Sequence, residues 1–215
     1  MKNTLKIALT VLAGALFSQA QASTTSIAAG TSYAGSQASA GAYKLVVDAA
    51  VTNSTVVAIY DNISNHGTLG GSYTNFAFKS TVNFGVSAAD AGAWSFRSGV
   101  DFGNGGAMFL DGVAVDFRTT DMWWGGSYGN SSQFLGANAT LSAGNHTLNL
   151  YGLEGCCDGG QQAQFKIGGG NFTTFASTDG LIAAVPEPET YAMLLAGLGL
   201  LGFTARRRKS AKNVG

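Results

Sequence analysis

The sequence predicts an all-β fold: an antiparallel β-sandwich of the jelly-roll kind, flanked by an N-terminal signal helix and a C-terminal hydrophobic helix. Glycine accounts for 31 of the 215 residues, Phe (13) and Tyr (7) are plentiful, and only 11% of the residues are charged. This composition is typical of a turn-rich secreted β-protein. Between the two ends, short apolar or alternating runs recur between turn signals, and no long stretch shows helical periodicity.

The first 22 residues predict a secretory signal peptide. Lys2 and Lys6 form its positive end, an apolar run follows at 7–17, and Ala20-Gln21-Ala22 supplies a cleavage site for signal peptidase. We therefore expect an exported protein whose mature chain begins near residue 23.

The region between residues 23 and 184 is expected to hold one domain. Residues 23–42 are mostly Ser, Ala, Gly and Thr, and they predict a flexible leader or an edge strand. The β-sandwich is predicted at 43–176, with a linker at 177–184. Its strands are expected at Tyr43–Val51, Thr55–Tyr60, Tyr73–Phe78, Val82–Val86, Trp94–Val100, Ala107–Leu110, Val113–Phe117, His146–Leu153, Ala163–Ile167 and Asn171–Phe175.

A hairpin is predicted at Asp111-Gly112, which lies between two apolar runs. This dipeptide is typical of a type I′ turn, which needs positive φ at both central positions. In the strand that follows, Val113, Val115 and Phe117 alternate with smaller or polar residues, so these three side chains are expected to face the core.

The charge balance of the domain argues against a nucleic-acid partner. Residues 23–185 contain five basic and ten acidic side chains, a net charge of −5. Five scattered bases form no stripe that could follow a phosphate backbone.

The C-terminal segment 185–209 has three parts in a fixed order. Pro186-Glu187-Pro188 stays extended because proline cannot donate a backbone hydrogen bond. The run 191–205 carries no charge and predicts a short transmembrane segment. Arg206, Arg207 and Arg208 then hold the end of the chain on the cytoplasmic side.

This order resembles the PEP-CTERM sorting signal, whereas an ordinary membrane anchor does not need Pro-Glu-Pro. The resemblance implies that an exosortase cuts near the motif. The protein would then be anchored transiently in the inner membrane and released to the cell surface or the exopolysaccharide matrix.

The middle of the chain resembles the protective-antigen-type β-sandwich of flocculins, fibro-slime proteins and some glycosidases. The resemblance runs from Tyr73 to Ile167. It is carried by Trp94–Phe96, Ala107–Val115, Leu141–Leu148, Tyr151–Glu154 and Gln164–Ile167. In addition, Cys156-Cys157-Asp158-Gly159 looks like the Cys-Cys-Xaa-Gly subgroup of PEP-CTERM proteins.

This resemblance implies a calcium and sugar site. In the lectin members, two adjacent aspartates bind calcium, and the ion holds sugar hydroxyls. Here Asp101 is followed by Phe102, so the second aspartate is missing. Asp101, Asn104 and Asp158 are the candidate calcium ligands, since calcium takes several oxygen ligands. The alternative is that Asp101 and Asn104 only shape a glycine-rich turn.

Three aromatic residues, Trp123, Trp124 and Tyr128, lie in a glycine-rich loop. They are candidates for a sugar-stacking platform, and an equally good interpretation is that they cap one end of the sandwich.

The sequence lacks the familiar catalytic motifs: no Gly-x-Ser-x-Gly, HExxH or CxxC pattern occurs. His66 lies in a turn context, and His146 is expected to be structural. A carboxylate pair for glycoside hydrolysis would need two of Asp111, Asp116, Asp121 and Glu154 to meet in space.

The leading hypothesis is therefore a non-catalytic adhesin or carbohydrate-binding module whose partner is an exopolysaccharide or other glycan. A polysaccharide-acting enzyme and a ligand-free structural matrix protein are the alternatives.

Cys156 and Cys157 are the only cysteines, and export would place them in an oxidising compartment. They can bond to each other, bond to other chains or stay as thiols. We favour the bond to each other, which would make a rigid knob at the end of a strand. We place this knob beside the ligand-binding loop as a hypothesis.

Overall fold

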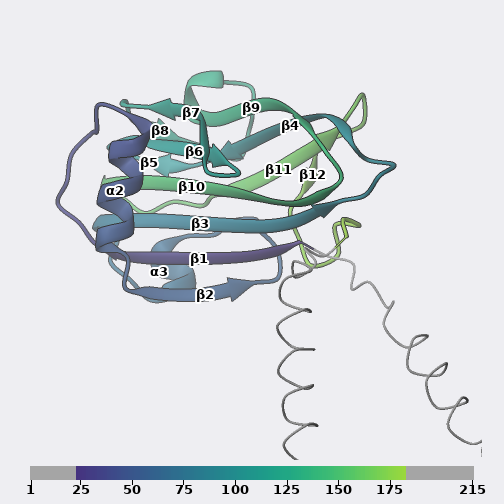
Figure 1. Cartoon of the computed structure of the whole chain (residues 1–215). Helices are drawn as coiled ribbons and strands as arrows, with labels where there is room; N and C mark the ends of the chain where they lie inside the picture. Colours follow the sequence, from purple (N-terminus) through teal and green to yellow (C-terminus); the bar gives the residue numbers. More distant parts are fainter. Residues whose placement is uncertain (1–22, 183–215) are drawn as a thin grey trace, which may run out of the picture. The chain divides into compact units, whose positions relative to one another are not determined.

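The computed structural model of the protein describes residues 23–182, so the predicted signal peptide and sorting signal lie outside the described residues. Two antiparallel sheets pack face to face (Figure 1). The six-stranded sheet has the order β2-β1-β3-β10-β6-β7, the four-stranded sheet has the order β12-β11-β4-β9, and β5 pairs with β8 in a small third sheet. The predicted all-β sandwich is confirmed.

The elements have the following bounds, in chain order. They are β1 (Thr24–Thr31), α2 (Ala40–Ala50), β2 (Asn53–Val57), α3 (Asn65–Leu69), β3 (Thr74–Val86), β4 (Gly92–Gly99), β5 (Asp101–Phe102), β6 (Gly106–Leu110), β7 (Val113–Arg118), β8 (Met122–Trp123), the 3₁₀ helix η1 (Ser131–Gln133), β9 (Phe134–Leu141), β10 (Gly144–Cys156), β11 (Gln162–Ile167) and β12 (Thr173–Thr174). No helix within 23–182 has the length and apolar character needed to cross a bilayer.

Two apolar clusters hold the layers together. The larger fills the space between the sheets, and its fully buried side chains include Phe78, Phe84 and Trp94. The smaller lies between the six-stranded sheet and α2, which runs across the strands at one end (Figure 1). Because β3 and β10 are covered on both faces, neither shows a clean alternation of apolar and polar residues.

The prediction of a strand at Tyr43–Val51 was wrong, because this segment forms α2. The Ser39 hydroxyl caps the helix by accepting a hydrogen bond from the Ala42 amide at 3.2 Å. Tyr43 and Val47 are four residues apart and fully buried, so they form the stripe with which the helix packs on the sheet. The apolar run was too short to separate a helical period from an alternating one.

The prediction of a flexible leader at 23–42 was also wrong, because Thr24–Thr31 form the strand β1. β1 pairs with both β2 and β3, so it is an interior strand of the six-stranded sheet. Its small residues let the end of α2 lie close to the strand. A Cβ on Gly30 would lie 1.8 Å from the Ala50 carbonyl oxygen. The sandwich therefore begins at β1, and not at residue 43.

The predicted linker at 177–184 is attached to the domain over the part that the structure describes. Leu181 is buried, and the Ile182 carbonyl accepts a hydrogen bond from the Gly85 amide at 2.8 Å.

The hairpin at Asp111-Gly112 is confirmed, since the two residues have φ values of 50° and 78°. The expected burial of the next strand was wrong. A bulge shifts the pairing of β6 with β7 between Met108 and Phe109, which breaks the alternation. Val113 and Phe117 are 66% and 43% exposed, and of the three expected residues only Val115 packs against the core.

The structure also differs in smaller ways from the predicted strands. The segments 73–78 and 82–86 are one continuous strand, β3, because the polar residues between them remain in the ladder with β10. β9 was not predicted, since its sequence has few large apolar side chains.

Candidate functional site

A pocket of about 490 Å³ lies where β5, β8 and the end of β10 meet. We call it the loop pocket. Its lining residues are Asp101, Gly103, Asn104, Asp121, Trp123, Glu154, Gly155, Cys156 and Cys157. It therefore brings together two of the three predicted calcium ligands, one predicted stacking residue and both cysteines.

The short pairing of β5 with β8 positions the walls of this pocket. Asp101 is opposite Trp123, and Phe102 is opposite Met122. Phe102 and Met122 are fully buried and anchor both strands in the core. A Cβ on Gly152 of β10 would lie 2.3 Å from the Phe102 ring, so the anchor depends on glycine at that position.

Asp101 is a buried carboxylate, with only 6% of its surface exposed. Burial raises its pKa to about 7, and the nearby charges of Glu154, Asp121 and Asp158 act in the same direction. Gly159 passes directly over this side chain, since a Cβ there would lie 2.1 Å from Asp101 Oδ2.

Glu154 braces the pocket from β10. It is buried, and its two carboxylate oxygens accept hydrogen bonds from the backbone amides of Gly103 (2.6 Å) and Cys156 (2.7 Å). Burial raises the pKa of Glu154, while the amide hydrogen bonds oppose the rise. The sequence did not single out Glu154 for this site, because only the pairing of β10 with its neighbours places it there.

Cys156 and Cys157 are joined by a disulfide, which confirms the favoured state. The amides of Cys157 and Asp158 both donate to the Tyr73 carbonyl, at 2.9 and 3.0 Å. Both cysteines are exposed and line the loop pocket. The disulfide knob therefore lies at the loop pocket, and its place beside a ligand-binding loop stays a prediction.

The three aromatic residues do not form one platform. Trp123 is 67% exposed at the loop pocket. Trp124 turns inward instead, and a Cβ on Gly99 would lie 2.2 Å from its ring. The Tyr128 hydroxyl contacts the Gln162 side chain at 3.1 Å, on a different hollow of the surface. One residue therefore fits the stacking interpretation, and Trp124 fits the capping one.

The calcium set of Asp101, Asn104 and Asp158 fits the structure poorly. The Asp158 carboxylate accepts hydrogen bonds from the amides of Asn65 (2.9 Å) and His66 (2.6 Å), which occupy its oxygens at the start of α3. Within 23–182, no group of three or more His, Cys, Asp or Glu side chains is arranged to hold a metal ion. Calcium binding at Asp101 and Asn104 stays a prediction.

The histidines have structural contacts. The His146 ring lies between Asp111 Oδ2 (2.7 Å) and the Ser142 carbonyl (2.9 Å), so it joins the hairpin to β10. His66 stacks on Tyr73 at 3.8 Å between ring centroids.

Two of the four candidate catalytic carboxylates, Asp121 and Glu154, meet in the loop pocket, and the other two lie outside it. Asp111 contacts His146, and Asp116 accepts the Gly136 amide at 2.9 Å. Asp121 and Glu154 share the loop pocket with Asp101.

Comparisons with known proteins concern two parts of the chain, the C-terminal motif and the β-sandwich. Residues 184–209 match the family described as the PEP-CTERM protein-sorting motif. The chain carries a PEP-CTERM sorting motif. This motif indicates exosortase-dependent export to the cell surface or the extracellular space. A search of curated proteins gives no match to this chain.

Two solved structures share its fold. The PA14 sugar-binding domain from an RTX adhesin has a TM-score of 0.51 and 15% identity, covering 77% of this chain and 99% of that one. The PA14 domain of the MpAFP antifreeze protein has a TM-score of 0.50 and 14% identity, covering 76% and 91%. At these identities the likeness shows a PA14-type β-sandwich and nothing further.

Proposed function

We propose that this PEP-CTERM protein is a non-catalytic carbohydrate-binding module of the cell surface or exopolysaccharide matrix, and that the loop pocket receives the sugar. The observation that carries the proposal is the exposed indole of Trp123 at a pocket walled by Asp101, Asn104 and the disulfide. An aromatic face stacks on the apolar face of a sugar ring, while a few placed polar groups bind its hydroxyls. The sugar-binding PA14 domain of the RTX adhesin, which has this fold, supports the proposal.

The test is a glycan array probed with the full-length chain and its variants. Trp123→Ala is expected to lose binding. Tyr33→Ala is the matched control, because Tyr33 is 83% exposed and does not line the loop pocket. Equal binding by wild type and Trp123→Ala would refute the pocket assignment. Failure of the wild type to bind any glycan would favour the ligand-free structural protein.

A polysaccharide-acting enzyme is the second candidate, and one observation favours it. The raised pKa of Asp101, about 7, in a pocket shared with Asp121 and Glu154 is a property of general acids. The test is the release of reducing ends from a panel of polysaccharides. Turnover that disappears in Asp101→Asn would establish the enzyme, whereas binding without turnover would support the module.

The sorting proposal names signal peptidase and exosortase as partners and a transient stay in the inner membrane. It predicts a released form that lacks the residues beyond about Glu189. Deletion of 206–209 is expected to cause missorting, because the basic cluster orients the segment. Fractionation of cells with and without the exosortase checks this, and unchanged surface display of the deletion would contradict it.

A further inference from the structure

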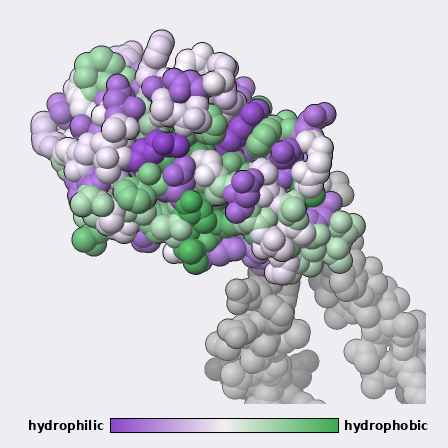
Figure 2. Space-filling view, turned by 90° about the horizontal axis from the view of Figure 1, so that it is seen from above, coloured by the Kyte–Doolittle hydropathy of each residue, from purple (hydrophilic) through white to green (hydrophobic). Residues whose placement is uncertain are grey.

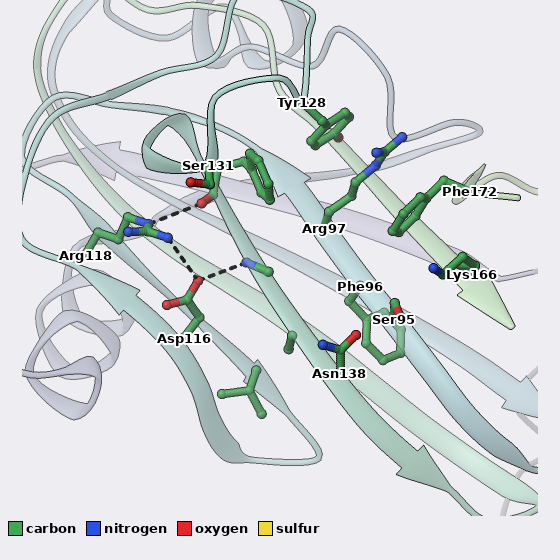
Figure 3. A pocket seen from close by; sticks show the side chains of 14 residues that line it. Ser95, Phe96, Arg97, Asp116, Arg118, Tyr128, Ser131, Asn138, Lys166 and Phe172 are labelled. Carbon is green, nitrogen blue, oxygen red and sulfur yellow. Dashed lines mark hydrogen bonds and ion pairs between the residues drawn. The ribbon is translucent and has the colours of Figure 1, made fainter. Parts of the chain in front are cut away.

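A second, larger hollow lies on the outer face of the four-stranded sheet, apart from the loop pocket. We call this groove of about 670 Å³ the sheet groove (Figure 3). Ser95, Gly136 and Asn138 form much of its floor, on strands β4 and β9. Tyr128, Phe134 and Phe172 add aromatic side chains along it.

The charge of this groove is opposite to that of the domain. Residues 23–182 contain ten acidic and only five basic side chains, and three of the five bases, Arg97, Arg118 and Lys166, line the sheet groove. The other two, Lys44 and Lys79, both pair with Asp48, at 2.5 and 2.7 Å. Within 23–182, Arg97 and Lys166 are therefore the two basic side chains without a carboxylate partner, and both line the sheet groove.

Arg97 is held between two aromatic rings. Its guanidinium carbon lies 3.8 Å from the ring centroid of Tyr128 and 3.8 Å from that of Phe172. Its Nε donates to Gln164 at 2.7 Å, and no carboxylate of the described residues pairs with it. Arg97 is half-buried, and this burial lowers its pKa. A guanidinium fixed in this way presents its remaining N–H groups to an anion with little loss of rotamer freedom.

Lys166 is the neighbour of Arg97 in this arrangement. Its ammonium lies 5.1 Å from the centroid of the same Phe172 ring, so the two cations flank one aromatic side chain (Figure 3). Arg118 has a partial partner in Asp116, at 4.0 Å. Asp116 is the one carboxylate among the lining residues, so the groove carries three cations against a single anion.

The surroundings favour a chain of sugar rings over a peptide. A peptide that adds to a sheet edge needs open backbone groups. On the groove side of β9 the Gly136 amide donates to Asp116 and the Phe134 carbonyl accepts from Arg118, so these groups are taken. The face of the molecule seen from above in Figure 2 mixes hydrophilic and hydrophobic residues. Hydroxyl and amide groups on the floor suit sugar hydroxyls.

We propose that the sheet groove binds a carboxylate-bearing, uronate-containing polysaccharide, with a sugar carboxylate held by Arg97 and Lys166. The proposal adds a second site to the proposed function and rests on it only in taking a polysaccharide as the partner.

The experiment measures binding of the full-length chain to polygalacturonate at low salt. Arg97→Gln and Lys166→Gln are each expected to weaken binding by about tenfold or more, the loss of one charge-assisted hydrogen bond. Lys166→Gln keeps the test valid if the ring-stacked Arg97 proves necessary for folding. Lys44→Gln removes the same charge outside the groove and is expected to bind like the wild type. Neutral dextran is expected to show no dependence on Arg97 or Lys166.

Four results would overturn the proposal: no binding of polygalacturonate, equal weakening by Lys44→Gln, tighter binding of dextran sulfate, or equal binding of polyglutamate. The first would show that the groove does not take a uronate chain, the second would leave only diffuse charge attraction, the third would assign a sulfate, and the fourth a peptide. Trp123→Ala separates the two sites, since it is expected to remove glycan-array binding and to leave polygalacturonate binding unchanged.

Discussion

The loop pocket and the sheet groove, two sites of one sandwich, carry charges of opposite sign. The loop pocket gathers buried carboxylates, Asp101 and Glu154, and the sheet groove gathers cations. In the loop pocket, backbone amides donate to Glu154, and burial raises the pKa of both acids. In the groove, Arg97 is held between two aromatic rings. β8 supplies Trp123 to the loop pocket, and the connection that follows it supplies Tyr128 to the sheet groove.

This difference in charge shows that the two sites depend on different parts of the fold. The acidic site needs the chain to pass close to buried side chains, and glycines at 152 and 159 allow this. The basic site needs only side chains that point outward from neighbouring strands. We therefore expect the two sites to fail independently, and the predictions below test this from the largest effect to the smallest.

Gly152→Ala is expected to have the largest effect. The new methyl group would overlap the fully buried Phe102 ring, which anchors β5 under the loop pocket. Such overpacking costs about 3 kcal/mol or more of the free energy of unfolding. Chemical denaturation measures it. Gly125→Ala is the control, because the nearest atom to its Cβ would be the Trp123 ring at 3.9 Å, and it is expected to unfold like the wild type.

Asp101→Asn is expected to change how stability depends on pH. The folded-state pKa of Asp101 is raised to about 7, above its ordinary value of about 4 in an unfolded chain. The folded state therefore binds the extra proton between these values, and its stability falls as pH rises from about 4 to about 7. The amide removes this fall, so the variant should exceed the wild type at pH 8 by on the order of 2 kcal/mol.

Denaturation at pH 5 and pH 8 checks the prediction for Asp101. Asp61→Asn serves as the control, because Asp61 is exposed. Parallel pH curves for wild type and Asp101→Asn would contradict a raised pKa.

Calcium is expected to have a moderate effect if Asp101 and Asn104 bind it. Millimolar calcium should then raise Tm by about 2–4 °C through binding to the folded state. Asp101→Ala should abolish the rise, and Asp158→Ala should keep it, because Asp158 is engaged by Asn65 and His66. If calcium does not change Tm in a thermal scan, the remaining interpretation is that Asp101 and Asn104 only shape a glycine-rich turn.

Replacing both cysteines by serine is expected to change global stability little, by less than about 1 kcal/mol, because a bond between adjacent residues closes almost no loop. Glycan binding at the loop pocket should weaken, since Cys156 and Cys157 line it, while polygalacturonate binding stays the same. Alkylation followed by intact mass checks the starting state: the wild-type monomer should take up two alkyl groups only after reduction.

Local chemistry made part of this structure predictable from the sequence. Asp111-Gly112 indicated its turn because few other pairs accept positive φ twice, and adjacent cysteines in an exported chain indicated their bond. The segment Tyr43–Val51 was misread as a strand, because its apolar run alternates as a strand would, whereas Tyr43 and Val47 lie on one face of a helix. Tertiary packing against β10 decides between the two.

The sheet groove could not be predicted in the same way. Arg97, Lys166 and Arg118 come from β4, β11 and β7, and along the chain they look like scattered bases in an acidic domain. The strand order places β11 beside β4, which brings Lys166 and Arg97 to one face. The contact of β7 with β9 then brings Arg118 to the same groove.

Asp116→Asn is expected to have the smallest effect and the opposite sign. It removes the carboxylate of the sheet groove, so polygalacturonate should bind about two- to fivefold more tightly at low salt. The amide oxygen of Asn can still accept the Gly136 amide, which Asp116 now accepts at 2.9 Å, so the fold should be kept. Asp90→Asn makes the same change in net charge at a residue outside the groove and should leave affinity unchanged. Titrations at low and high salt measure both, and the gain should shrink as salt screens the charges. Equal gains from the two variants would show that net charge, and not this groove, governs the binding.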